Sequence, residues 1–299
     1  MRRQRRVFAL GFFDGVHLGH QALLSQCVKL AAELNVQTAA ITFDRHPRSL
    51  FTQTPPPLIN SVEDRCGLLR RYGIGQIYTY PVTREVMSMP WQSFLGELME
   101  YGAAGFVCGD DFRFGSRGEG NSEKLQQFCR ERNLPYVTVP EQTVDGVRIS
   151  STHIRNLIEG GKMEEAGRFL GHPHVLTGRV VHGHQLGRTL GIPTANLLLP
   201  AGLAVPKFGV YACLAEIAGK KYPAVANVGT RPTVNGVGIT VEPWILDFEG
   251  DLYDREILLE FHRFLRPEVK FPDLAALQRE IRKNAEETRD YFANQTFGG

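Results

Sequence analysis

The sequence predicts an α/β domain followed by a β-rich domain. In the first half, short apolar runs alternate with segments whose apolar residues recur at helical spacing. From about residue 171 onward, short β-type segments separated by glycine and proline dominate, and one amphipathic segment closes the chain. Alternating strands and helices indicate a parallel sheet covered on both faces, whereas many short strands indicate an antiparallel barrel or sandwich. At 299 residues the chain has room for two domains, which we assign to residues 1–170 and 171–299.

The elements of the first half follow in order. Apolar runs predict strands over residues 7–10, 38–43, 77–80, 106–108 and 136–139. Helices are expected to begin near His20 and over residues 62–72, 90–101, 122–131, 151–158 and 162–170. Ser61 and either Ser150 or Ser151 are expected N-caps. Because ligands bind beyond the carboxyl ends of parallel strands, the polar segments after the first, second and fourth strands are candidate sites.

The second half is expected to be mostly strand. Apolar segments predict strands over residues 177–181, 210–217, 222–228, 239–248 and 257–264. Residues 274–292 are expected to form one amphipathic helix, with one face made by Leu277, Ile281, Ala285 and Thr288.

The segment GFFDGVHLGH, from Gly11 to His20, lies between the first expected strand and the first expected helix. A helix N-terminus offers unpaired N–H groups and positive dipole charge, which suit a phosphate. Asp14 and Gly15 are expected to make the turn, and Gly19 lets backbone approach a ligand. His17 and His20 can donate to phosphate oxygens whose charge grows in a transition state. Two surface histidines beside a turn are the alternative, but the flanking strand and helix favour phosphate chemistry.

Two further segments carry candidate binding groups. In ISSTHIR, the hydroxyls and Arg155 either close on a triphosphate or form an ordinary cap with one exposed arginine. The glycine-rich segment GRVVHGHQLGRTLGIPTAN can wrap phosphates through backbone N–H groups. Thr194 and Asn196, two residues apart, would share one face of a strand, and their neutral oxygens suit Mg²⁺ shared with ATP. Glu242 could deprotonate a hydroxyl acceptor, although a lone strand glutamate is usually only solvated.

Composition limits the class of protein. Hydrophobic residues make up 42 % of the chain and the net charge is +2, so we expect a globular protein with no nucleic-acid partner. No apolar run approaches the length of a membrane span, and the basic run Arg2 to Arg6 lacks the apolar stretch of a signal peptide. The five cysteines are scattered without CxxC pairing, which fits reduced thiols in the cytoplasm. No obligatory protein partner is implied.

Eight motifs follow one another along the chain. GFFDGVHLGH, TFDRHP, GDDFRFG and ISSTHIR lie in the first half, and GRVVHGHQLGRTLGIPTAN, GVY, NVGTRPT and EPWILDF lie in the second. In this order they resemble the bacterial bifunctional riboflavin kinase/FMN adenylyltransferase family. The first four resemble its adenylyltransferase module and the last four its riboflavin kinase module. The resemblance implies a Rossmann-like nucleotidyltransferase domain, then a six-stranded Greek-key barrel with a C-terminal helix. It also implies two ATP-dependent steps, from riboflavin to FMN and from FMN to FAD with release of pyrophosphate, supported by Mg²⁺.

The resemblance carries roles onto residues of this sequence. It implies catalytic roles for His17, His20 and Arg155 in the first half and for Glu242 as the base in the second. Ligand contacts are implied in the first half at Gly11, Phe13, Asp14, Gly19, Asp111, Arg148, Ser151 and Thr152. In the second half they are implied at Gly178, His182, Gly183, Gly187, Arg188, Gly191, Pro193, Thr194, Asn196 and Asn227, with Thr194 and Asn196 as metal ligands.

The chain departs from the family pattern at three positions: Arg45 stands where proline is usual, Trp244 where histidine is common, and Asn284 where an aspartate often sits. These departures concern substrate positioning rather than the reaction class. Two alternatives remain, a flavin- or nucleotide-binding regulatory protein without turnover and an enzyme competent in only one step. If Glu242 is not the base, Asp247 is the next candidate, on the opposite face of the same expected strand.

Overall fold

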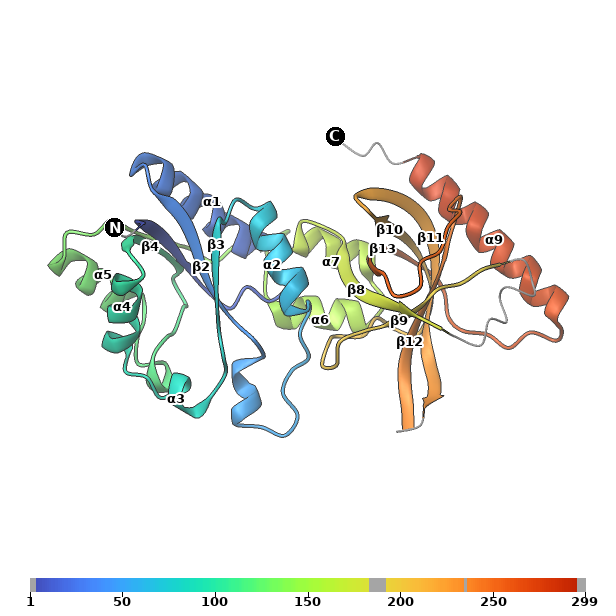
Figure 1. Ribbon diagram of the computed structural model, residues 1–299, viewed down its shortest axis with the longest axis horizontal. Coiled ribbons are helices and arrows are strands. Elements are labelled where there is room, and N and C mark those ends of the chain that lie inside the picture. The colour runs from blue at the N-terminus through green and yellow to red at the C-terminus, as the bar shows by residue number, and fades with distance from the viewer. Residues whose placement is uncertain (1–3, 183–191, 234–235, 295–299) are drawn as a thin grey trace. The chain divides into compact units, whose positions relative to one another are not determined.

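The computed structural model describes residues 4–182, 192–233 and 236–294, with side chains left out of the description at 231–233 and 236–238 (Figure 1). The chain divides into two compact units, residues 1–153 and 154–299. Each unit is described by itself below.

The first unit is built on a five-stranded parallel sheet in the order β3-β2-β1-β4-β5. Its strands are β1 (Arg6–Leu10), β2 (Gln37–Phe43), β3 (Gln76–Tyr80), β4 (Ala103–Gly109) and β5 (Tyr136–Val139). The helices are α1 (Leu18–Glu33), α2 (Val62–Arg71), α3 (Arg84–Met87), α4 (Trp91–Glu100) and α5 (Ser122–Glu131). Two single 3₁₀ turns, η1 (Pro47–Leu50) and η2 (Ser116–Gly118), and a small hairpin of β6 (Thr143–Val144) and β7 (Val147–Arg148) complete it. The predicted parallel sheet is confirmed, and the short α3 is an addition to it.

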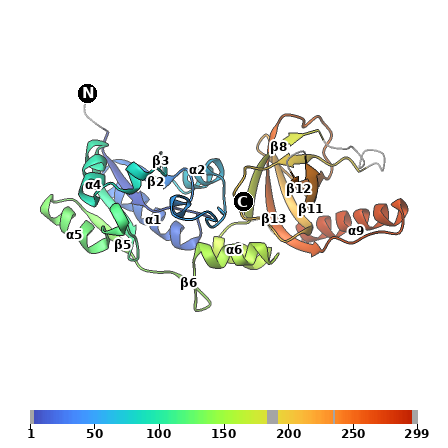
Figure 2. The ribbon, with the colours of Figure 1, turned by 90° about the horizontal axis from the view of Figure 1, so that it is seen from below.

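Helices cover both faces of this sheet, as the two ribbon views show (Figures 1 and 2). Phe8 and Leu10 of β1 pack in one core with Leu95 and Leu98 of α4 and with α5. The alternate residue Val7 faces α1, whose Cys27 Sγ donates to the Val7 carbonyl oxygen at 3.4 Å. Because strand side chains alternate between faces, a strand covered on both sides must be apolar throughout.

The strand order creates the place for a ligand. β1 lies between β2 and β4, so the loops after β1 and β4 diverge to opposite sides and leave a crevice at the carboxyl edge. Predicted caps hold the helices around it: the Ser61 hydroxyl accepts from Asp64 N–H at 2.9 Å, and Ser150 accepts from His153 N–H at 3.2 Å.

The second unit is a closed six-stranded barrel in the order β10-β11-β12-β9-β8-β13. Its strands are β8 (His174–Val181), β9 (Asn196–Leu198), β10 (Gly209–Ile217), β11 (Lys220–Thr233), β12 (Gly236–Ile245) and β13 (Glu256–Arg266). Helices α6 (Ser151–Glu159) and α7 (Met163–Leu170) precede it, and α9 (Leu274–Ala293) follows it. The barrel is therefore confirmed. The short strand β9, which begins at Asn196, was not among the five strands that we expected.

One expected strand is corrected. β12 ends at Ile245 rather than continuing to residue 248. Asp247 has a φ of 58°, a left-handed conformation that a strand does not contain. The chain therefore turns at this point, and our assumption that Asp247 lies on a strand face is wrong.

Helix α9 lies against the outside of the barrel. Its Ala285 packs with Val210, Val225 and Leu246, and Phe292 packs with Ala212 and Leu214. A bidentate pair between Arg289 and Asp247, with the closer contact at 2.9 Å, also joins α9 to the turn after β12.

Candidate active sites

The loop that joins β1 to α1 has an unusual backbone. Phe13, Gly15 and Val16 have φ values of 59°, 83° and 40°, all in the left-handed region. Such a conformation is uncommon for phenylalanine and an outlier for the β-branched valine. Gly11 has a specific packing role, because a Cβ there would lie 2.9 Å from the ring of Phe13. The loop is thus held in a strained form, as is common at functional sites.

His17 and His20 form a stacked pair at the start of α1. Their ring centroids lie 3.6 Å apart at an interplanar angle of 12°. His17 is the N-cap, and its Nδ1 accepts from the backbone N–H of His20 at 3.3 Å, which leaves Nε2 as the ring nitrogen that can donate to a ligand. Burial, the His17 charge and the Arg65 charge together hold the pKa of His20 well below its usual range. His20 is therefore a neutral imidazole at physiological pH.

A polar cavity of about 270 Å³ lies in front of this pair. Seven predicted residues line it: Gly11, His17, Gly19, His20, Asp111, Arg148 and Ser151. They come from the loop after β1, the start of α1, the loop after β4, strand β7 and the start of α6, so the tertiary fold brings separate motifs together at the crevice. The Ser151 hydroxyl donates to the carbonyl oxygen of Asp14 at 3.0 Å, which ties α6 to the first loop.

Arg148 stands at the rim of this cavity between two acidic side chains. It pairs with Asp111 at 2.9 Å and with Glu141. Glu141 was not a candidate from the sequence, because nothing in its local pattern marks it.

The other predicted residues of this region do not line the cavity. Phe13 and Asp14 are buried beneath it, where Phe13 packs edge-on against His20 at 5.2 Å and Asp14 accepts from Ile59 N–H at 2.9 Å. Thr152 and Arg155 lie on α6, and Arg155, 9 % exposed, falls beyond the end of the first unit at residue 153.

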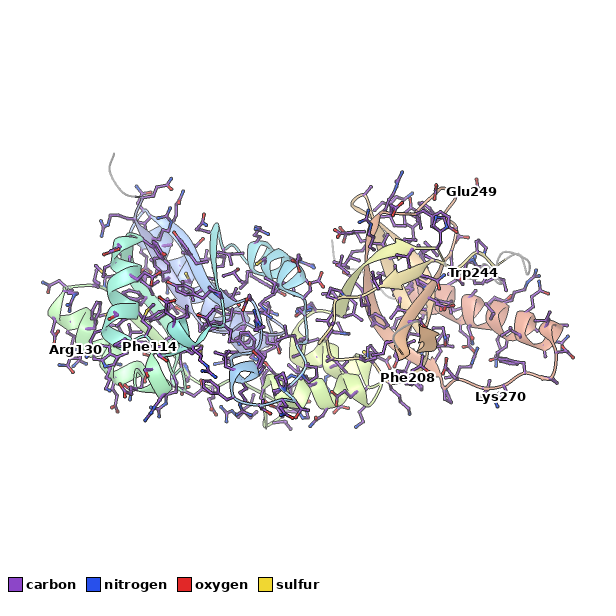
Figure 3. All side chains as sticks on the ribbon, turned by 60° about the horizontal axis from the view of Figure 1, so that its bottom comes forward. Phe114, Arg130, Phe208, Trp244, Glu249 and Lys270 are labelled. Carbon is purple, nitrogen blue, oxygen red and sulfur yellow. The ribbon has the colours of Figure 1, made fainter. Side chains whose placement is uncertain are left out.

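A second, apolar cavity of about 200 Å³ adjoins the polar one and shares Gly11 and Phe112 with it. Aromatic and methionine side chains dominate its wall: Phe43, Tyr80, Met87, Met89, Phe94, Phe112 and Phe114 (Phe114 is labelled in Figure 3). We did not predict this cavity. Its residues come from five separate segments, and the only local signal was the aromatic content of GDDFRFG.

In the barrel, a cavity of about 390 Å³ lies between β11, β12 and α9. It is lined by the predicted residues Thr194, Asn227 and Glu242, and by Trp244, whose position is labelled in Figure 3. Asn227 and Glu242 are directly opposite each other in the β11–β12 ladder. Leu277, Ile281 and Asn284 form the α9 wall.

The structure shows contacts for each of the three residues that depart from the family pattern. Asn284 is buried and its Oδ1 accepts from Arg266 Nε at 3.0 Å. Trp244 faces Thr194 in an isolated β-bridge. Arg45 is exposed and pairs with Asp44 at 3.4 Å.

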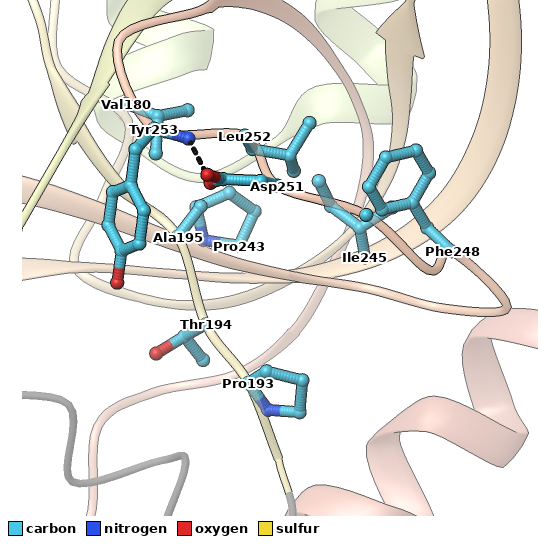
Figure 4. A pocket seen from close by; sticks show the side chains of 11 residues that line it. Val180, Pro193, Thr194, Ala195, Pro243, Ile245, Phe248, Asp251, Leu252 and Tyr253 are labelled. Carbon is cyan, nitrogen blue, oxygen red and sulfur yellow. Dashed lines mark hydrogen bonds between the residues drawn. The ribbon is translucent and has the colours of Figure 1, made fainter.

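Another cavity of about 380 Å³ lies at the end of the barrel (Figure 4). Pro193 and Thr194 line it together with Asp251 and Tyr253, and Asp251 accepts from Tyr253 N–H at 2.9 Å. The predicted His182 stacks on Tyr253 with ring centroids 3.8 Å apart. Thr194 thus borders both barrel cavities.

Among the residues that the structure describes, the other predicted positions of the second half line neither of these two barrel cavities. Gly178 is buried in β8, where a Cβ would lie 3.0 Å from that of Leu197, so this glycine allows β8 and β9 to pack closely. Asn196 begins β9 and does not line either barrel cavity. Asp247, the alternative base, pairs with Arg289 and is not part of the cavity that contains Glu242. Four predicted residues lie outside the described part of the chain: Gly183, Gly187, Arg188 and Gly191.

Comparison with known proteins identifies the family. The FAD synthetase family profile matches residues 1–153, and the riboflavin kinase profile matches residues 170–292. A bifunctional riboflavin kinase/FMN adenylyltransferase of Listeria monocytogenes is 34 % identical over 96 % of this chain and 93 % of its own. One from Escherichia coli K12 is 35 % identical over 96 % and 92 %. The chain belongs to the bifunctional riboflavin kinase/FMN adenylyltransferase family. It is therefore an enzyme of flavin cofactor synthesis, which converts riboflavin to FMN and FMN to FAD with ATP.

A solved structure shows the same fold as this member of the family. It is a crystal structure from Streptococcus pneumoniae titled as a macrolide-efflux protein, with a TM-score of 0.86 and 32 % identity over 97 % of this chain and 95 % of its own. In the described residues of the present chain, no helix is both long and apolar enough to cross a bilayer.

Proposed function

We propose that residues 1–170 form the domain that adenylylates FMN and that residues 171–299, which contain the barrel, form the domain that phosphorylates riboflavin. One observation carries the first assignment. The stacked histidines that follow the strained loop line a polar cavity, and this cavity adjoins an aromatic one. A triphosphate needs polar donors and a flavin ring needs an apolar slot, and the two cavities meet at Gly11 and Phe112.

In the adenylylation step, a phosphate oxygen of FMN attacks the α-phosphorus of ATP. The bond from that phosphorus to the bridging oxygen breaks, and pyrophosphate leaves with the electron pair. The nucleophile is already an anion, so positioning and charge stabilisation suffice. We assign stabilisation to His17 and His20, with Ser151 and Thr152 as phosphate contacts. The catalytic role that the family resemblance implies for Arg155 stays a prediction, since Arg155 does not line this cavity. Asp111 and Arg148 would contact flavin and nucleotide, while Phe13 and Asp14 support the loop from beneath.

A neutral His20 suits this role. It can donate one N–H to a phosphate oxygen without first losing a proton, and its low pKa keeps that state constant across physiological pH. The Nδ1 of His20 is buried and has no hydrogen-bond partner among the described residues. A bound phosphate would supply a partner for this ring.

In the kinase step, the nucleophile is the ribityl hydroxyl of riboflavin, which must lose its proton. We assign the base to Glu242 and the flavin ring to the cavity under α9 that Trp244 also lines. ATP would occupy the cavity at the end of the barrel, with His182 and Tyr253 at its edge.

We assign a magnesium site to Thr194 and Asn196, because Mg²⁺ binds neutral oxygens of this kind together with ATP phosphates. Thr194 borders the cavity assigned to ATP, and Asn196 lies two residues further along the chain. When bound, the ion neutralises charge on the phosphates. In the described residues there is no group of three or more His, Cys, Asp or Glu side chains that could hold a metal ion. We propose that ATP phosphate oxygens complete the coordination.

Reciprocal variants test the division of labour. His20→Ala should lower the rate of FAD formation from FMN by about 10² or more, since one charge-stabilising donor is lost. Glu242→Gln should lower the rate of riboflavin phosphorylation by about 10² to 10⁴, toward the low end if proton transfer is late. Each variant is assayed with riboflavin and with FMN as the flavin, in the presence of Mg²⁺ and ATP, and the flavins are separated.

Each variant serves as the control of the other, because each should retain the activity of the other unit. Loss of both activities in a folded His20→Ala protein would contradict the two-site assignment. A Glu242→Gln protein that phosphorylates riboflavin at the parent rate would remove Glu242 as the base.

We also propose that the enzyme acts in the cytoplasm on small molecules alone. All five cysteines are free and four are buried, which suits a reducing compartment. Neither nucleic acid, membrane nor an obligatory protein partner has a role in this proposal.

A further inference from the structure

Arg65 on α2 is among the largest fully buried side chains of the described structure, with none of its surface exposed. Arginine is rarely buried completely unless it is paired. No motif marked this residue in the sequence. Its surroundings therefore need an explanation.

Arg65 contacts both the strained loop and the end of β2. Nη1 donates to the Thr42 hydroxyl at 3.0 Å and to the Phe43 carbonyl oxygen at 2.9 Å. Nη2 lies 3.9 Å from Asp14 Oδ1. The guanidinium also lies over the ring of Phe12, 4.6 Å from its centroid.

These contacts join three segments that are distant in the sequence. Thr42 is the second-last residue of β2, Asp14 and Phe12 belong to the loop after β1, and Arg65 comes from α2. Thr42 extends the link, because its hydroxyl donates to the Phe12 carbonyl oxygen at 2.7 Å. The planar guanidinium of Arg65 thus links α2 both to β2 and to the loop after β1.

The loop needs such support. Phe13 and Val16 hold left-handed backbone conformations that persist only where the surroundings impose them. Phe13 is the residue that packs edge-on against His20, so a relaxed loop would move the histidine pair. A displacement of about 1 Å at such a distance from the chemistry can lower a rate by 10².

We propose that Arg65 is a positioning residue for FMN adenylylation, which holds the Phe12–Val16 loop so that His17 and His20 meet the ATP phosphates. The proposal rests on the phosphate site proposed above. A buried ion pair is weak evidence for a role in stability, since apolar replacements are often as stable. Placement of the loop is the role that the geometry supports.

Three variants test this role. Arg65→Met removes the donors but keeps much of the volume, Arg65→Lys keeps the charge without the planar fork, and Thr42→Val removes one hydroxyl without changing the shape. Arg70→Met is the matched control, because Arg70 lies on the same helix and is exposed. Steady-state kinetics of FAD formation from FMN and ATP are measured for each, together with riboflavin kinase activity.

We expect Arg65→Met to lower kcat for FAD formation by about 10², and Arg65→Lys and Thr42→Val to lower it by about tenfold. The KM for ATP should change by less than about threefold, because the interaction lost is one realised in the transition state. Riboflavin kinase activity should stay at the parent level in every variant. Because the barrel is expected to fold by itself, folding of the first unit is checked separately, by the thermal unfolding of each variant followed by the fluorescence of Trp91. Arg70→Met should match the parent in both activities.

The proposal is overturned if folded Arg65→Met makes FAD at the parent kcat, or if its whole effect is a higher KM for ATP. If Arg65→Met does not fold, Thr42→Val decides, and a parent kcat in that variant overturns the proposal. Failure of the phosphate site itself is a separate result, because His20→Ala would then retain FAD formation.

Discussion

At the residue scale, burial decides which polar side chains can react. Burial raises the pKa of the Cys27 and Cys108 thiols to about 12 and that of Cys129 to about 11. These thiols remain protonated at physiological pH and are poor nucleophiles, since the thiolate is the reactive form. The same effect of burial acts on His20, where it keeps the ring neutral beside the phosphates.

The buried His174 of β8 should make the stability of the barrel sensitive to acid. It is fully buried, and burial together with the nearby His172 charge lowers its pKa to about 3. An unfolded histidine titrates near 6.5, so between these values only the unfolded chain binds the proton. The free energy of unfolding of the second unit should therefore fall as the pH falls, by about 2 kcal/mol from pH 6.5 to 5 through this residue.

The test compares the pH dependence of unfolding in His174→Leu with that of the parent. The chain has two tryptophans, Trp91 in the first unit and Trp244 in the second, so a Trp91→Phe background makes fluorescence report on the barrel. Urea unfolding at pH 6.5 and pH 5 should show a smaller loss in His174→Leu. Equal losses in both proteins would contradict the assignment, since all other titrating groups are shared.

At the element scale, α9 both covers the barrel and completes a site. Its buried face meets the barrel through Ala285 and Phe292, while Leu277 and Ile281 line the cavity that contains Glu242. The position of this helix thus determines the width of the proposed riboflavin site. Docking of α9 and riboflavin binding should be coupled.

Phe292→Ala tests that coupling. The ring is 7 % exposed and packs on Ala212, Leu214 and His262, whose ring centroid lies 5.0 Å away. Its removal should destabilise the second unit by about 3 kcal/mol and raise the KM for riboflavin. Thermal unfolding and kinase kinetics provide the two measurements.

Leu274→Ala is the control, because Leu274 lies on the same helix and is 56 % exposed. It should alter neither stability nor KM. An unchanged riboflavin KM in a destabilised Phe292→Ala protein would show that the helix does not shape the site.

At the scale of the whole molecule, the two units have separate cores and separate candidate sites. The barrel has a closed sheet of its own, and α7 packs against β8 and β13 with a buried face that includes Met163 and Ala166. Domains with their own core fold alone in many proteins.

This arrangement predicts the activity and the stability of two fragments. The fragment 172–299 should phosphorylate riboflavin and make no FAD. The fragment 150–299 should do the same but be more stable by at least about 2 kcal/mol, because it retains the apolar face of α7. Flavin separation and thermal unfolding measure both properties. A folded but inert pair of fragments would mean that the kinase site needs groups from residues 1–149.

Local patterns in the sequence were enough for most elements. The helix over residues 122–131 and the strand over residues 136–139 have the predicted bounds, because caps and apolar periodicity act between near neighbours. We predicted the strand that corresponds to β12 to end three residues too late, because apolar content does not reveal a left-handed turn at Asp247. The three-residue strand β9 is held by pairing with β8 and β12, which no local pattern encodes.

By itself, the sequence determined the two-part fold, the order of the motifs, the family resemblance and the histidine pair at the start of a helix. Those features depend on residues within a few positions of one another. Only the tertiary structure decided that Phe13 and Asp14 lie beneath the cavity, that an aromatic cavity adjoins it, and that Arg65 supports the loop. Each of these depends on strand order and helix packing, which bring together side chains that are tens of residues apart in the chain.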